Sequence, residues 1–196
     1  MDTKCRLCKE ADETVQHIIS ACPELAQTAY LKRHDQVAAK IYWQLVRNSN
    51  MDVPYECWLL QPEPVIESDE VKILWNFDIE TDQEIEARSP DIVIINKKEK
   101  TCKIIDIAVP ADHNVTKKEL EKITKYENLR REVERLWKVR AEIVPVVVGA
   151  LGTMSRQLRR WLNKLEAENT VWSLQEQALC GTASIVKTHL GHLESR

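Results

Sequence analysis

Residues 87–110 read ARSPDIVIINKKEKTCKIIDIAVP, and this stretch decides the fold that the sequence predicts. Two apolar runs rich in β-branched residues, 91–95 and 103–109, flank a charged turn, which is the pattern of a β-hairpin. Asp91 opens the first run and Asp106 lies inside the second. A hairpin would therefore bring the two carboxylates to one end of a sheet.

These two acids also suggest a chemistry. Burying a carboxylate among apolar residues is costly unless it is paired or binds a metal ion. Two carboxylates at one point supply the oxygen ligands that Mg²⁺ or Mn²⁺ prefers. For Asp91 alone a Pro–Asp turn is the commoner explanation, whereas Asp106 has isoleucines on both sides. Metal-dependent hydrolysis of phosphodiesters is therefore the first functional hypothesis.

Length and composition set the broad class of the chain. Its 196 residues suffice for one domain and a small appendage. No apolar run is long enough to span a membrane, and the N-terminal residues do not resemble a signal peptide. A Cys-x-x-Cys pair in a non-secreted chain indicates metal or redox chemistry. We expect a nuclear or cytoplasmic protein that is neither secreted nor bound to a membrane.

The formal net charge of −3 conceals an uneven distribution. Residues 52–86 contain eleven acids and one base, whereas residues 117–140 contain nine bases and five acids. A local basic stripe is enough to attract the phosphates of nucleic acid. DNA, or alternatively RNA, is therefore the expected partner.

The remaining periodicity predicts an α/β protein. The predicted strands are 71–79, 91–95, 103–109 and 143–148. The predicted helices are 25–47, 116–139, 153–168, 171–180 and 182–190. The 116–139 helix joins the last two strands, and such a crossover makes them parallel. Prolines in residues 52–64 predict a loop there.

The 116–139 helix is predicted to begin with a capping box formed by Thr116 and Glu119. Its apolar face comprises Leu120, Ile123, Leu129, Val133 and Leu136. Lys118, Lys122 and Lys125 share another face, because they lie four and three residues apart. For any one of these lysines, a solvated surface position is the alternative.

A second motif lies near the N-terminus. Cys5-x2-Cys8-x8-His17-x4-Cys22 places four zinc ligands in one short segment. Zinc binds such ligands tetrahedrally in closed structural sites. A segment this short has too small an apolar core to fold without a metal ion or another cross-link. A redox dithiol and a buried cysteine pair beside an unrelated histidine are the alternatives. The other three cysteines have no ligand spacing: Cys57, Cys102 and Cys180.

With these motifs the chain resembles the C-terminal part of non-LTR retrotransposon polyproteins, where a CCHC zinc knuckle precedes a restriction-like endonuclease. The resemblance implies a restriction-endonuclease-like, PD-(D/E)xK core of α-β-β-β-α-β order. The implied divisions are a knuckle at 1–24, a helix and proline-containing linker at 25–64, the nuclease core at 65–152 and C-terminal helices at 153–196. The chain has no [FY]-x-D-D reverse transcriptase signature.

The resemblance also implies site residues. The family's basic-Pro-Asp signature falls on Ser89-Pro90-Asp91, with Arg88 as a substitute for the missing base, and its second acid falls on Asp106. In the strict motif a lysine follows the second acid by two residues, but here that position is Ala108. The family's downstream lysine and Lys-Tyr pair fall on Lys122 and Lys125-Tyr126.

Two functions follow as expectations. In the first, the chain nicks DNA. Asp91 and Asp106 hold Mg²⁺ or Mn²⁺, Lys122 acts on water or phosphate, Lys125 and Tyr126 support it, and Glu84 or Glu86 adds a carboxylate. The expected phosphate contacts are Arg88, Lys118, Lys125, Arg130 and Arg131. In the second, the chain is an inactive remnant that binds nucleic acid through the knuckle and the basic helix, with Trp43 and Trp58 stacking on bases.

Overall fold

The computed structural model describes residues 3–57 and 60–194. The strands are β1 (Val65–Glu67), β2 (Val71–Trp75), β3 (Ile92–Asn96), β4 (Thr101–Ala108) and β5 (Arg140–Val147). The α-helices are α1 (Val15–Ser20), α2 (Pro23–Leu25), α3 (Leu31–Asn48), α4 (Val115–Trp137), α5 (Leu158–Lys164) and α6 (Val171–Glu194). Short π-helical or 3-10 turns are η1 (Ala26–Tyr30), η3 (Asp112–Asn114) and η4 (Glu168–Thr170).

The strands form one mixed sheet in the order β1-β2-β3-β4-β5. Neighbours are antiparallel except β4 and β5, which are parallel and joined by α4, as the crossover prediction required. Asp106 pairs with Pro145 in that register. Proline donates no ladder hydrogen bond, and β5 tolerates it because β5 is an edge strand. The predicted α/β class is confirmed.

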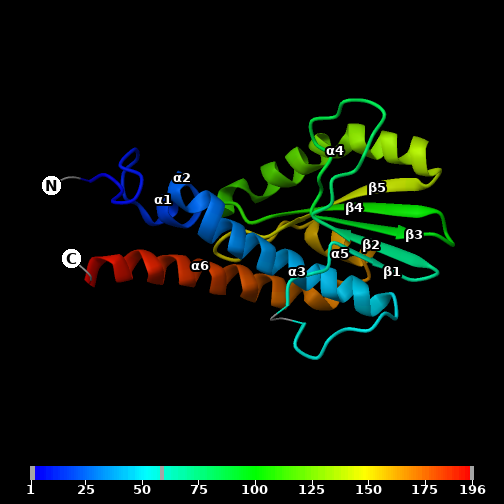
Figure 1. Cartoon of the computed structure of the whole chain (residues 1–196). Helices are drawn as coiled ribbons and strands as arrows, with labels where there is room; N and C mark the ends of the chain where they lie inside the picture. Colours follow the sequence, from blue (N-terminus) through cyan, green and yellow to red (C-terminus); the bar gives the residue numbers. More distant parts are fainter. Residues whose placement is uncertain (1–2, 58–59, 195–196) are drawn as a thin grey trace.

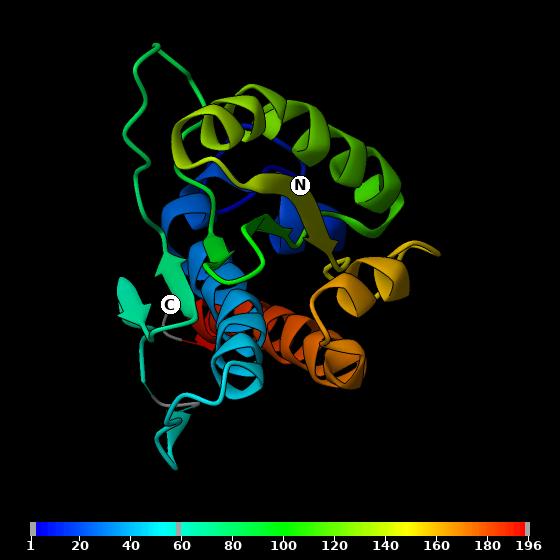
Figure 2. The ribbon, with the colours of Figure 1, turned by 90° about the vertical axis from the view of Figure 1, so that its right-hand side faces the viewer.

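Helices cover both faces of the sheet. Figure 1 and Figure 2 show α4 on one face and α3 with α6 on the other. Side chains of a strand alternate between faces, so Ile104 packs under α4 while Ile105 packs under α3. Two separate apolar cores result, and together they fix the sheet between the helical layers.

The strand predictions need two corrections. The strand predicted at 71–79 ends at Trp75, because Asn76 takes a left-handed conformation (φ 45°) and donates its backbone N–H to Asp91 O at 2.8 Å. Ile79 is nevertheless buried in the core under α4. The short edge strand β1 was not predicted, so four strands rather than three precede α4.

The C-terminal helices also differ from the prediction. The two helices predicted at 171–180 and 182–190 form one continuous helix, α6. Gly181 lies inside α6 and permits close packing against α3, because a Cβ at this position would lie 2.5 Å from Arg33 Cγ. The helix predicted at 153–168 is reduced to α5. None of the described helices is long and apolar enough to cross a membrane.

Two predictions about α4 were wrong. The helix begins at Val115 with Asn114 as N-cap, so Thr116 lies inside the first turn and forms no capping box. Glu119 instead accepts a hydrogen bond from the indole of Trp161. Leu120, assigned to the apolar face, is 62% exposed.

The helix predicted at 25–47 is interrupted by η1 before α3 begins.

The N-terminal segment is docked on the rest of the chain rather than separate from it. Cys5, Ile18 and Cys22 form a small apolar cluster with Ile185 of α6. The two ends of the chain consequently lie at the same end of the molecule (Figure 1). The C-terminal helix thus supports the metal-binding motif predicted at the N-terminus.

Candidate functional site

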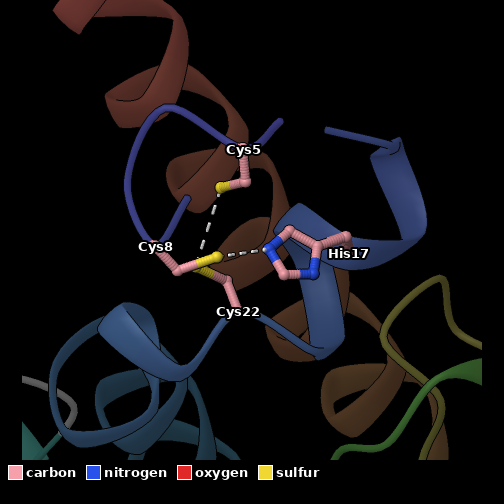
Figure 3. A group of neighbouring side chains, drawn as sticks. All are labelled: Cys5, Cys8, His17 and Cys22. Carbon is pink, nitrogen blue, oxygen red and sulfur yellow. Dashed lines mark hydrogen bonds between the residues drawn. The ribbon is translucent and has the colours of Figure 1, made fainter. Parts of the chain in front are cut away.

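The four predicted zinc ligands lie together. Cys5, Cys8, His17 and Cys22 point toward one another (Figure 3), and their ligand atoms are all within 4.8 Å of one another. Cys5 Sγ and Cys22 Sγ are 4.0 Å apart, and Cys8 Sγ is 3.3 Å from His17 Nε2. A zinc–sulfur bond of about 2.3 Å separates two sulfurs of a tetrahedral site by about 3.8 Å. The cluster could therefore bind a zinc ion.

Local backbone structure builds this cluster. The chain reverses after Cys8 because Lys9 takes a left-handed conformation (φ 63°) and donates its N–H to Cys5 O at 2.8 Å. Thr14 caps α1 by accepting a hydrogen bond from His17 N at 3.1 Å. The cap orients the first turn of α1, which carries His17. The following turn brings in Cys22, directly before Pro23.

The thiol groups of the cluster differ in acidity. Backbone N–H groups of Ala11 and Glu10 bond to Cys8 and lower its pKa to about 6. Burial raises the pKa of Cys22 to about 11. A metal ion would stabilise the thiolate form that Cys22 does not reach by itself at neutral pH. This donor set suits zinc.

The acidic pair lies at one end of the β3–β4 hairpin, as predicted. Ile92 pairs with Ile105, so continuing the antiparallel register sets Asp91 opposite Asp106. Ile107 N donates a hydrogen bond to Asp91 Oδ2 at 2.5 Å. The strand that carries Asp106 therefore also holds the side chain of Asp91.

Asp106 is 2% exposed and is compensated by lysines of α4. Lys122 Nζ forms an ion pair with Asp106 Oδ2, and Lys125 Nζ lies 3.9 Å from Asp106 Oδ1. Burial, followed by the charge of Asp91, raises the pKa of Asp106, and Lys122 opposes this rise. Oδ2 is therefore the oxygen of Asp106 that Lys122 neutralises.

The structure selects among the three lysines of the predicted face. Lys122 and Lys125 turn toward Asp106, whereas Lys118 Nζ pairs with Glu121 Oε2 at 2.6 Å. Tyr126 is buried beside Lys125, and its hydroxyl donates to Ser89 O at 3.1 Å. Lys125 Nζ donates in turn to this hydroxyl at 2.8 Å. The Lys-Tyr pair thus joins α4 to the Ser-Pro-Asp turn.

His34 belongs to this site, but sequence reasoning missed it. Its Nε2 lies 3.2 Å from Asp91 Oδ2 and its Nδ1 lies 3.0 Å from Asp35 Oδ1. Burial lowers the pKa of His34, but the two carboxylates outweigh it and raise the pKa to about 9. One signal was present in the sequence: His34 continues the apolar stripe of Ala38 and Ile41.

Arg33, the preceding residue, was also missed. Its side chain is 2% exposed, and it donates from Nη1 to Ile19 O at 2.9 Å and to Thr182 Oγ1 at 2.8 Å. Its Nη2 donates to Val109 O at 3.3 Å. Arg33 therefore connects the zinc-ligand segment, helix α6 and the end of β4, three residues after Asp106.

The predicted phosphate-binding residues are all engaged in ion pairs. Lys125 pairs with the buried Asp106, and the others pair with more exposed carboxylates. The closest pairs are Arg88–Asp78 at 2.8 Å, Lys118–Glu121 at 2.6 Å, Arg130–Glu127 at 2.7 Å, Arg130–Glu134 at 2.8 Å and Arg131–Glu127 at 3.3 Å. Surface pairs of this kind contribute only about 0.2–1 kcal/mol each. Phosphate groups could therefore replace the carboxylates at small cost.

Other predicted contributors are not brought to the acidic pair. Glu84 and Glu86 lie in the loop before β3, and among the described residues only the Cys/His cluster groups three or more ligand atoms closely. Trp43 is buried against Tyr42, with ring centroids 5.0 Å apart, and does not offer a stacking surface. Trp58 lies outside the described residues.

Comparisons with protein-family models and with curated proteins found no match for the chain. The geometry of the two sites is therefore the basis for any functional conclusion.

Proposed function

We propose that the chain is a metal-dependent DNA endonuclease domain of the restriction-like type, linked to a zinc knuckle as in non-LTR retrotransposon polyproteins. The observation that carries this proposal is the meeting of Asp91, Asp106 and Lys122 at one end of the hairpin. The element order supports it, since a helix, antiparallel strands, a crossover helix and a parallel strand follow one another as in a PD-(D/E)xK core.

The acidic pair fits a hard divalent cation. Asp106 is buried, its pKa is raised by burial and by Asp91, and its Oδ2 is paired with the ammonium group of Lys122. A cation bound by the carboxylates would relieve the repulsion between the charges of Asp91 and Asp106. Carboxylate oxygens favour Mg²⁺ or Mn²⁺. When bound, the cation supplies Lewis-acid stabilisation of the phosphate and of an attacking water.

The side chains around the acids have distinct proposed roles. Lys122 contacts Asp106 and is close enough to stabilise negative charge that develops on a phosphate held there. Lys125 and Tyr126 position the Ser-Pro-Asp turn through Ser89 O, and so position Asp91. Ala108 does not weaken the proposal, because the α4 lysine reaches the acid that a strand lysine would serve.

The Cys/His cluster is proposed to hold a structural zinc ion. Three thiols and one imidazole complete a tetrahedral set and leave no position for a reactant. The proposed phosphate contacts are the exposed bases Arg88, Lys118 and Arg131, together with Arg130. Such contacts position DNA without reading its sequence.

Nicking of supercoiled plasmid in Mg²⁺ or Mn²⁺ tests this function. We expect Asp91→Ala, Asp106→Ala and Lys122→Ala each to abolish nicking by the zinc-loaded chain. The matched controls are Asp69→Ala and Lys98→Ala, on exposed turns, which should retain it. If the wild-type chain and Asp91→Ala nick at the same rate in every metal, the proposal is wrong.

A nucleic-acid-binding module without catalysis is the second candidate. The observation that favours it is the ion pairing of Asp106 with Lys122 and Lys125, which can neutralise the buried acid without a metal ion. This candidate predicts DNA or RNA binding that is unchanged when Mg²⁺ is omitted, with no cleavage in any metal. Metal-dependent nicking would exclude it.

A further inference from the structure

We propose that His34 is a positioning residue that holds the Asp91 carboxylate in its metal-binding orientation. This inference rests on the proposed function, because it assigns a role toward the divalent cation of that same site. His34 comes from α3, which precedes the sheet in the chain, so the site draws on a third element beyond the hairpin and α4.

Two donors meet on one oxygen of Asp91. His34 Nε2 lies 3.2 Å from Asp91 Oδ2, and Ile107 N donates to the same oxygen at 2.5 Å. The two contacts come from different elements, one from α3 and one from the strand β4. They fix the rotation of the carboxylate, and the other oxygen, Oδ1, is not used by either contact.

The imidazole ring is itself held at both nitrogens. His34 Nδ1 lies 3.0 Å from Asp35 Oδ1, so the ring spans two carboxylates. Hydrogen bonds from surrounding groups to a metal-binding carboxylate orient it, and losing such a partner weakens metal binding about 10- to 100-fold. His34 has the geometry of such a partner.

The turn of α3 that carries His34 is fixed by its neighbour. Arg33 is buried and donates to Ile19 O, Thr182 Oγ1 and Val109 O. Val109 lies just beyond β4, so this turn of α3 is bound to the strand that carries Asp106. The close approach of Arg33 to Gly181 leaves the helix little room to move. His34 therefore acts through Asp91 from a rigid support.

The test is Mn²⁺ affinity of the zinc-loaded full chain without DNA, from the electron paramagnetic resonance signal of free Mn²⁺. We expect His34→Ala to weaken Mn²⁺ binding about 10- to 100-fold. His34→Gln, whose amide can donate to Asp91, should restore most of the affinity. His113→Ala, which removes an exposed histidine, should leave it unchanged. Thermal unfolding of each variant checks that the fold is kept.

The outcomes separate this inference from the proposed function. If the wild-type chain binds Mn²⁺ and His34→Ala binds it equally well, His34 has no positioning role while the metal site stands. If His34→Gln is as weak as His34→Ala at an unchanged unfolding temperature, hydrogen bonding to Asp91 is not the cause. If the wild type binds no more Mn²⁺ than an Asp91→Ala, Asp106→Ala double variant, both proposals are overturned.

Discussion

The Cys/His cluster and the acidic site are assembled in opposite ways. All four candidate zinc ligands lie within residues 5–22: Cys5 and Cys8 beside one turn, His17 on α1 and Cys22 directly before α2. The acidic site takes Asp91 and Asp106 from a hairpin, Lys122 from α4 and His34 from α3. Spacing along the chain is therefore enough to identify the first site, whereas the second exists only once the layers have packed. The stability of the first site should depend on metal binding, and that of the second on the packing of α3 and α4 against the sheet.

The largest effect is expected from removing zinc. His17→Ala, or a zinc chelator, should unfold residues 3–25 because metal binding supplies about 10–16 kcal/mol in zinc-finger peptides. Strands β3 to β5 should stay folded, since their cores lie under α3 and α4. Hydrogen exchange measured by mass spectrometry reports both regions in one sample. Cys180→Ser, at an exposed thiol, is the control.

Loss of protection throughout the sheet would contradict this contrast, because it would make the zinc site a folding requirement for the whole chain. Unchanged protection of residues 3–25 after chelation would show that the segment folds without metal.

Arg33→Met should have the next largest effect, because Arg33 joins the two regions. The substitution leaves Ile19 O, Thr182 Oγ1 and Val109 O without their charged donor, and such bonds contribute about 1.5–3 kcal/mol each. Met also removes a buried charge whose desolvation opposes these bonds, so we expect the free energy of unfolding in urea to fall by about 3 kcal/mol rather than by their sum. Arg131→Met, at an exposed guanidinium, should change it by less than about 0.5 kcal/mol. Equal effects of the two variants would show that Arg33 is not a structural link.

Lys122→Met tests how much the ion pair between Lys122 and Asp106 stabilises the fold. The substitution leaves the buried Asp106 carboxylate without its main cation and should destabilise the chain by about 2 kcal/mol. This cost is below the range for fully buried ion pairs, because Lys122 is 19% exposed. Asp106→Asn added to Lys122→Met should recover part of this loss. Urea unfolding measures the cycle, with Lys118→Met as the control for a lysine paired at the surface. Additive losses in the double variant would mean that the pair is not coupled.

The smallest effect is expected at the surface of α4. If the proposed DNA surface is right, Arg131→Gln should weaken DNA binding modestly. It should reduce the slope of log affinity against log salt by about 1, because one proposed phosphate contact is removed. Fluorescence anisotropy at several salt concentrations measures this slope. Lys98→Gln, on the hairpin turn at the other end of the strands, should leave it unchanged. A slope unaffected by Arg131→Gln would remove this face of α4 from the DNA surface.

The predictions that succeeded rest on local patterns. The β3–β4 hairpin was visible because strand periodicity and a charged turn are encoded in neighbouring residues. The parallel pairing of β4 and β5 followed from the helix predicted between them. The predictions that failed concern how surfaces meet. Residue 181 lies between two predicted helices but is inside α6, where glycine admits Arg33. Thr116 was predicted to form a capping box and lies inside the helix.

The sequence by itself determined the Cys/His set that could bind zinc, the hairpin with its two acids and the lysine-bearing helix. Each depends on spacing within a short segment, where backbone geometry relates position directly to direction in space. The resemblance had already implied Lys122. Only the tertiary structure showed that Lys122 contacts Asp106, that His34 meets Asp91, and that Arg33 connects the two sites. These contacts depend on how helices pack across the two faces of the sheet, and local periodicity does not encode that packing.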